Sequence, residues 1–114
     1  MARAQHFFIT IDDLARARGS EAAIAFDGES PQTLAAALQA ALREPALWER
    51  WRLLQDDPDE VDPAGGATDP AATVEGSLAA SRTELKVVTC LPHAIIKHRL
   101  DLLVGPNWKL RDVH

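Results

Sequence analysis

Apolar residues recur along the chain with two different spacings, and a spacing of two residues predicts strands. Residues 5–11 place three bulky apolar side chains on one face, which is typical of a strand. A short apolar run over residues 22–26 ends at a turn pair and predicts another strand. Residues 85–91 are rich in β-branched side chains and alternate, and residues 108–113 alternate as well.

Spacings of three and four residues predict two main helices. Ser30 and Pro31 are typical of a helix start, because serine accepts a hydrogen bond from an unpaired N–H and proline fits the first helical position. Pro45 is expected to interrupt this helix, and an apolar face continues beyond it. The second helix is predicted over residues 92–104 and ends where glycine and proline follow.

Residues 70–81 fit both patterns. Val74 and Leu78 have helical spacing, but they also belong to an alternating series. Gly76 is unfavourable in the middle of a helix. We therefore predict a strand that forms a hairpin with the following one and turns near Ser81-Arg82.

The order of these elements predicts an α+β fold in a single domain over residues 1–114. From residue 22 onward the order is β-α-β-β-α-β, which is similar to the ferredoxin-like arrangement, with an extra N-terminal strand before it. We expect a mostly antiparallel sheet with the helices on one face. Such folds support many unrelated activities, so the fold alone predicts no function.

Acidic side chains are concentrated in one stretch of the chain. The formal net charge is −5, but residues 55–75 hold seven acidic groups and no basic one. Within this stretch, residues 55–72 are rich in proline and glycine and poor in large apolar side chains, which predicts a flexible acidic loop. Its aspartates do not follow the spacing of a calcium-binding loop. The negative net charge is therefore concentrated in one predicted loop, and the remaining residues together carry a slightly positive net charge.

Composition narrows the classes of function. The acidic balance makes nucleic acid an unfavourable partner, because duplex binding depends on a basic face. No apolar run reaches the ~20 residues of a membrane-spanning helix. The single cysteine cannot form an internal disulfide, and residues 1–11 lack the apolar run of a signal peptide, so we expect a cytoplasmic protein.

Cys90 is the first candidate for chemistry. It lies between a predicted strand and a predicted helix, and His93 follows three residues later. A thiol at a helix N-terminus experiences positive potential that favours the reactive thiolate. Because its neighbours are apolar and cysteine is among the most buried residues, we expect Cys90 to lie in the core. A small thiol-dependent enzyme or redox protein using Cys90 and His93 is the alternative.

Metal and acid–base sites are predicted to be absent, and no cofactor is expected. His93 and His98 would lie about 140° apart around a helix, whereas metal-binding pairs share one face. Asp12, Asp13 and Asp27 follow predicted strands, where catalytic residues occur, but aspartate is also the usual cap and turn former at such positions.

Two further groups could bind ligands. Trp48, Trp51 and Arg52 lie close together before the acidic loop, and tryptophan and arginine are enriched in protein interfaces. Packing in the core is the other interpretation of these tryptophans. The C-terminal part contains a basic group that could hold an anion or simply face solvent: Lys97, Arg99, Lys109 and Arg111.

The sequence contains no complete catalytic motif. The function that it predicts is therefore a non-enzymatic protein-interaction or regulatory module. Its partner would be another protein or a second copy of the chain in a homodimer.

Overall fold

A four-stranded antiparallel sheet forms one layer of the computed structural model, which describes residues 3–114. The order of the strands in the sheet is β2-β3-β1-β4, and each strand runs antiparallel to its neighbours. The strands are β1 (Gln5–Ile11), β2 (Thr73–Ala79), β3 (Arg82–Thr89) and β4 (Lys109–Val113).

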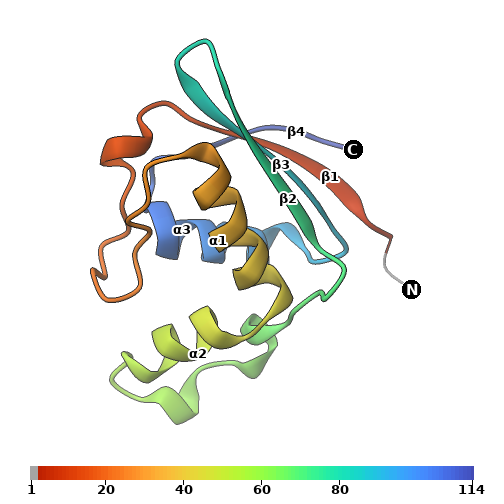
Figure 1. The fold of residues 1–114 in the computed structure, drawn as a ribbon. Helices are drawn as coiled ribbons and strands as arrows, with labels where there is room; N and C mark the ends of the chain where they lie inside the picture. Colours follow the sequence, from red (N-terminus) through yellow and green to blue (C-terminus); the bar gives the residue numbers. More distant parts are fainter. Residues whose placement is uncertain (1–2) are drawn as a thin grey trace.

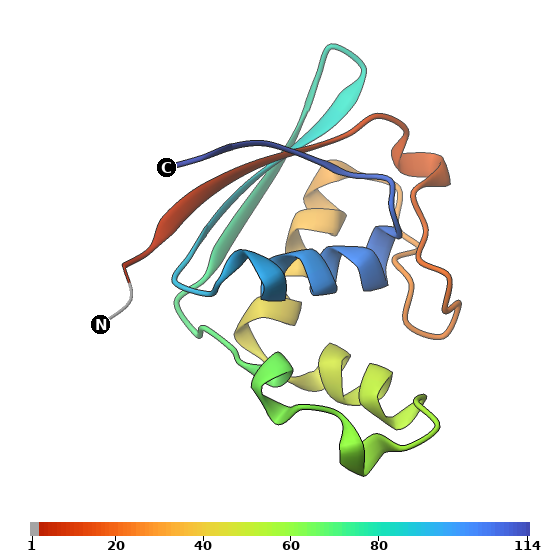
Figure 2. The same cartoon turned by 180° about the vertical axis from the view of Figure 1, so that it is seen from behind.

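Helices cover one face of this sheet and leave the other face open. The helices are α1 (Pro31–Arg43), α2 (Ala46–Leu53) and α3 (His93–Val104). α1 and α3 lie across the covered face, and α2 lies beyond their ends (Figures 1 and 2). The core forms between the layers, where Phe7 and Ile9 of β1 meet Leu38 of α1 and Leu100 of α3. The predicted α+β domain with helices on one face is confirmed.

The strand predicted over residues 22–26 does not form. This segment makes turns, in which the N–H groups of Ile24 and Ala25 donate to the Glu21 carbonyl. The side chains of Ile24 and Phe26 are buried, and the Phe26 N–H donates to the Leu103 carbonyl at the end of α3. The apolar run thus covers the core without pairing in the sheet, so β1 is the first strand among residues 3–114 and is itself the first strand of the β-α-β-β-α-β order.

Other boundaries agree with the sequence, except that β3 (Arg82–Thr89) begins and ends earlier than the strand predicted over residues 85–91. The Ser30 hydroxyl accepts a hydrogen bond from the Thr33 N–H (3.1 Å) at the start of α1, and Pro45 separates α1 from α2. The hairpin of β2 and β3 turns at Ala80 and Ser81, which both have positive φ. Two residues with positive φ suit the right-handed twist of a tight hairpin.

The two edges of the sheet differ. Side chains of α1 bond to the backbone at the β2 edge: Gln39 accepts from the Val74 N–H (3.0 Å) and Arg43 donates to the Ala72 carbonyl (2.6 Å). At the opposite edge every residue of β4 is exposed, and the pairing with β1 is irregular between Phe8 and Ile9. Charges and irregular pairing at an edge oppose pairing with other chains.

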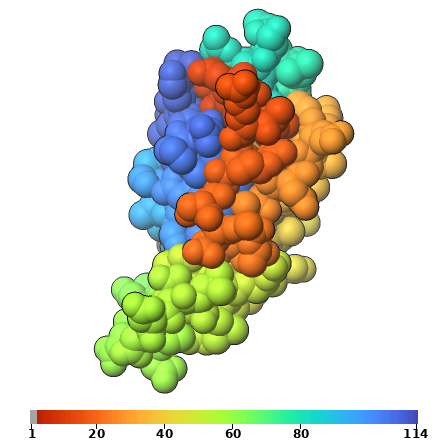
Figure 3. Space-filling model, turned by 90° about the vertical axis from the view of Figure 1, so that its left-hand side faces the viewer, coloured from red at the N-terminus to blue at the C-terminus, as the bar shows by residue number. Residues whose placement is uncertain are grey.

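The acidic segment is ordered into short turns at one end of the molecule. It contains two 3-10 turns, Pro58–Glu60 and Pro63–Gly66. Together with α2 it projects from the body of the molecule, in yellow-green in Figure 3. The flexibility expected of residues 55–72 stays a prediction, but the end of this segment is anchored, because Asp69 is buried.

Candidate functional site

The two tryptophans of α2 line an apolar pocket of about 300 Å³. Its walls come from α2, from α3 and from the acidic segment, three parts of the chain that lie far apart in the sequence. The residues that line this aromatic pocket are Trp48, Trp51, Val61, Asp62, Gly65, Ala94, Ile95 and His98.

Three aromatic rings form the base and wall of the aromatic pocket. The centroids of Trp48 and Trp51 are 6.4 Å apart, and the Trp51 ring meets the His98 ring edge-on at 4.4 Å. Trp48 is only 5% exposed, whereas Trp51 is partly exposed. Trp48 is therefore packed in the interior, while Trp51 keeps part of its ring exposed.

A pair of glycines allows the acidic segment to lie against Trp48. A Cβ atom on Gly66 would come within 2.8 Å of the indole, and one on Gly65 would come within 3.2 Å. Real Cβ atoms essentially never approach as closely as the first of these distances. The bare backbone of Gly65 and Gly66 thus closes one side of the aromatic pocket at van der Waals contact with the ring.

A buried arginine, Arg99, contacts two of the residues that line the aromatic pocket. Arg99 is fully buried, donates through Nη2 to the Gly65 carbonyl (2.8 Å), and lies 2.9 Å from His98 Nδ1 through Nη1. Its Nε has no hydrogen-bond partner among the described residues. Burial lowers the pKa of the Arg99 guanidinium to about 10, so the group is still charged at neutral pH.

His98 is neutral at neutral pH and can accept the bond from Arg99. Burial lowers the pKa of His98, and the positive charge of Arg99 lowers it further. The neutral ring therefore satisfies one N–H of the buried guanidinium and at the same time packs its edge against Trp51. Protonation of His98 would remove this acceptor and bring two cations together.

Arg52, the third member of the predicted group, lies over the Trp48 ring and does not itself line the aromatic pocket. Its guanidinium sits 5.9 Å from the centre of the Trp48 ring and forms an ion pair with Glu49 (3.1 Å). It also donates to the Pro58 carbonyl (3.2 Å). Arg52 thus ties the start of the acidic segment to α2.

Asp69 anchors the other end of the acidic segment. One of its carboxylate oxygens accepts from the Thr89 hydroxyl (2.7 Å) and the Cys90 N–H (3.1 Å), and the other accepts from the Ala71 N–H (3.0 Å). The Thr89 hydroxyl is the main cause that lowers the pKa of Asp69. The bonds join the acidic segment to the loop between β3 and α3.

Cys90 is exposed, which corrects the expectation that it lies in the core. Its position at the end of β3 leaves it outside the buried set, while its neighbour Leu91 takes the core position. His93 is exposed at the start of α3 and stacks on Phe7 at 6.4 Å. The carboxylate that bonds to the Cys90 backbone is negative, whereas reactive cysteines occur in electropositive surroundings.

The predicted basic group is divided between different parts of the molecule. Lys97 forms an ion pair with Asp101 on the surface of α3 (2.7 Å), and Arg99 is buried behind the aromatic pocket. Lys109 lies 3.8 Å from Asp12, and Arg111 lies on the open face of the sheet. The structure therefore does not bring these four residues into one cluster.

The remaining candidates form no catalytic or metal-binding arrangement within residues 3–114. No group of three or more His, Cys, Asp or Glu side chains in that range is placed to hold a metal ion. Asp13 forms a surface ion pair with Arg16 (3.5 Å), and Asp27 is exposed. Over the same residues, no helix has both the length and the apolar character needed to span a membrane.

Only two of the eight residues that line the aromatic pocket, Trp48 and Trp51, are predicted from the sequence as binding residues. The sequence offers His98 only as a candidate metal ligand. Nor does it predict the role of the adjacent glycines, although glycine is typical of close backbone approach. No sequence signal indicates that Arg99 is buried.

Comparisons of the chain with protein families, with curated proteins and with solved structures found no match. The function proposed next therefore depends on the residues of this chain alone.

Proposed function

We propose that the protein is a non-enzymatic interaction module that binds a partner protein through the aromatic pocket. The observation that carries this proposal is the partly exposed Trp51 ring in a largely apolar pocket of about 300 Å³, on a helix that ends in exposed leucines. Leu53, two residues after Trp51 in the sequence, is 64% exposed, and Leu54 is 49% exposed. An apolar cavity with a tryptophan wall and exposed leucines nearby is typical of a surface that accepts an anchor side chain.

The charges around the aromatic pocket favour a basic partner. Asp62 lines the pocket, and the acidic segment also exposes four other carboxylates: Asp56, Asp57, Asp59 and Glu60. None of these five forms an ion pair with another described residue. We therefore propose that the partner presents an aliphatic or aromatic anchor next to lysine or arginine, because complementary charge speeds encounter and selects the partner.

Short basic peptides that carry a single leucine, phenylalanine or tryptophan test this function. Tryptophan fluorescence of the full chain is titrated with each peptide and with acidic peptides of the same apolar content. Trp51→Ala is expected to weaken binding at least about ten-fold, as for hot-spot residues. The control Leu78→Ala removes an apolar side chain that is 68% exposed near the hairpin tip, more exposed than Trp51, and is expected to change nothing.

Two results would contradict the proposal. One is the absence of binding by any basic peptide at millimolar concentration; the other is binding that Trp51→Ala does not affect. Self-association is the alternative form of the proposal, and sedimentation velocity distinguishes it, since a second copy at this surface gives a dimer that Trp51→Ala dissociates.

A thiol-dependent activity is the second candidate, favoured by the exposure of Cys90. Cys90 would act as nucleophile and His93 would assist it. The test is the rate of alkylation by iodoacetamide as a function of pH, with His93→Gln as the paired variant. A rate no faster than that of a short cysteine peptide, and unchanged in His93→Gln, would exclude this candidate.

We also infer a ferredoxin-like arrangement that begins at β1, in a protein that acts in the cytoplasm. In support of the arrangement, β3 lies between β1 and β2, and β1 lies between β3 and β4. These are the interleaved positions of two split β-α-β units with their helices on one side of the sheet. A single cysteine that forms no disulfide supports the cytoplasmic location.

A further inference from the structure

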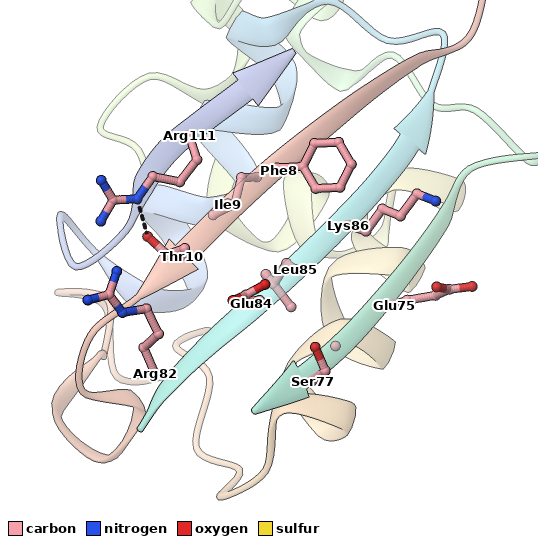
Figure 4. A pocket seen from close by; sticks show the side chains of 11 residues that line it. Phe8, Ile9, Thr10, Glu75, Ser77, Arg82, Glu84, Leu85, Lys86 and Arg111 are labelled. Atoms are coloured by element: carbon pink, nitrogen blue, oxygen red, sulfur yellow. Dashed lines mark hydrogen bonds between the residues drawn. The ribbon is translucent and has the colours of Figure 1, made fainter. Parts of the chain in front are cut away.

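The open face of the sheet carries a hollow of about 510 Å³ that is separate from the aromatic pocket. It lies on the side of the sheet away from the helices and is lined by side chains of β1, β2, β3 and β4 (Figure 4). Three of these side chains are cations: Arg82, Lys86 and Arg111. Two are carboxylates, Glu75 and Glu84.

Arg111 is held in one orientation by a buried hydroxyl. Its Nε–H donates to Oγ1 of Thr10 at 3.0 Å, and Thr10 is only 8% exposed. This bond uses the inner nitrogen of the guanidinium and leaves the two terminal nitrogens without a partner among the described residues. The Thr10 hydroxyl accepts here and donates to no other described group, so its own hydrogen is available as well.

Arg82, the first residue of β3, also lines the hollow. Figure 4 shows the guanidinium groups of Arg82 and Arg111 on the same side of the view, one above and one below the Thr10 hydroxyl. Within residues 3–114, Arg82 forms neither an ion pair nor a side-chain hydrogen bond. Two arginines with unused donors thus flank one unused hydroxyl hydrogen.

From this geometry we infer that the hollow binds the phosphate group of a small organic phosphate ester. A phosphate ester presents three terminal oxygens, which match the donors of Arg82, Arg111 and Thr10. Arginine binds phosphate through paired, charge-assisted hydrogen bonds. A carboxylate has only two oxygens in one plane and would leave one of the three donor groups unused.

The rest of the hollow would contact the organic part of the ester. Phe8 lies two residues before Thr10 on β1 and on the same face, and Lys86 pairs with Phe8 from β3. The Phe8 ring, which stacks on His114 at 5.2 Å, therefore provides an apolar surface within the same hollow. Glu84, which pairs with Thr10, opposes an anion by its charge and so limits the affinity.

Phenyl phosphate and inorganic phosphate are the probes for this site. Backbone amide shifts of the full chain are recorded by NMR during titration, with sodium acetate as the carboxylate control. The expected shifts are centred on Thr10, Arg82 and Arg111, with phenyl phosphate binding more tightly than inorganic phosphate, and acetate binding more weakly than either.

Four single variants report on the charges. Arg111→Gln and Arg82→Gln are each expected to weaken phenyl phosphate binding at least about ten-fold, the size of a lost charge-assisted bond. Glu84→Gln is expected to tighten it, because it removes a repulsive charge. Lys97→Gln also removes one positive charge, but from the surface of α3, and is expected to leave binding unchanged.

The inference is overturned if Arg111→Gln and Arg82→Gln bind as well as the original chain, or if Lys97→Gln causes an equal loss. Shifts centred outside the hollow overturn it too, as does a lack of saturation at tens of millimolar phenyl phosphate. Binding confined to polyanions such as heparin would indicate a diffuse charge effect and likewise overturns it. Circular dichroism checks that each variant is folded. If Arg111→Gln unfolds, Arg82→Gln still tests the inference, because among the described residues Arg82 makes no side-chain hydrogen bond or ion pair that the fold would lose.

Discussion

Replacement of Asp69 by asparagine is expected to destabilise the fold strongly, although the two side chains have the same shape. The carboxylate accepts three hydrogen bonds, from the Thr89 hydroxyl and from the N–H groups of Cys90 and Ala71. An asparagine has one oxygen and one NH₂ group at this position. In one orientation the NH₂ group would face the Ala71 N–H, and in the other it would face the Thr89 hydroxyl and the Cys90 N–H, so a donor always stands where an acceptor is needed.

The magnitude follows from the bonds that are lost. Hydrogen bonds to a charged group contribute about 1.5–3 kcal/mol, and a buried donor left without a partner costs about 1–3 kcal/mol. We expect Asp69→Asn to lower the free energy of unfolding by about 2–3 kcal/mol. For a domain of this size, that loss corresponds to a decrease of about 8–12 °C in Tm.

Urea unfolding at several pH values measures the effect and its cause. The pKa of Asp69 is lowered from 3.8 in the folded protein, so the unfolded chain takes up the proton first as the pH falls. The stabilisation by the carboxylate is therefore complete above pH 3.8 and is lost as the pH falls through the lowered pKa. The difference between the original chain and Asp69→Asn is expected to be largest at pH 7 and to shrink below pH 4.

Asp59→Asn is the matched control, because Asp59 is an exposed aspartate of the same segment. It is expected to change the free energy of unfolding by less than about 0.5 kcal/mol. A similarly small change in Asp69→Asn would refute the anchoring role. A large change that stays constant from pH 7 to pH 3 would refute the assignment of the effect to the carboxylate charge.

Three other predictions follow from single sites. Gly66→Ala places a methyl group against the Trp48 indole and is expected to cost about 1–3 kcal/mol in urea unfolding; a neutral result would show that the acidic segment does not rest on the ring. Ser30→Ala removes the cap on the Thr33 N–H and is expected to cost about 1 kcal/mol in the same assay, unless α1 starts at another residue. Cys90 is exposed, so a neutral thiol reagent is expected to label the native protein completely without denaturant; protection until unfolding would contradict its position.

Local signals in the sequence predicted most of the elements because they depend on neighbouring residues. Ser30 begins α1 because its side chain accepts from the N–H of Thr33, and Pro31 suits the first helical position because it has no N–H to satisfy. The alternation in residues 73–89 predicted a hairpin, and it forms because each strand buries only one face. The strand predicted at residues 22–26 was wrong, since an apolar run is buried equally well by a turn that packs on the end of α3.

The candidate site was predictable only in part. Trp48 and Trp51 were selected from their composition and spacing, and both line the aromatic pocket. His98 completes that pocket from α3, at a distance along the chain that no local pattern spans. The sequence places Arg111 in a basic group, whereas the side chain that it contacts is Thr10 of β1, and the other arginine that lines the same hollow is Arg82 of β3.

The sequence by itself determined most of the helical and extended segments and the place where the negative charge collects. These properties depend on the backbone preferences and side chains of residues within a few positions of each other. Only the tertiary structure decided that Arg99 is buried, that Cys90 is exposed and that Asp69 is an anchor. Burial and hydrogen bonding depend on which distant segments pack together. An arginine, a cysteine or an aspartate can lie on the solvated surface or in an interior where its polar atoms are hydrogen-bonded, and the residues next to it in the sequence do not decide between the two.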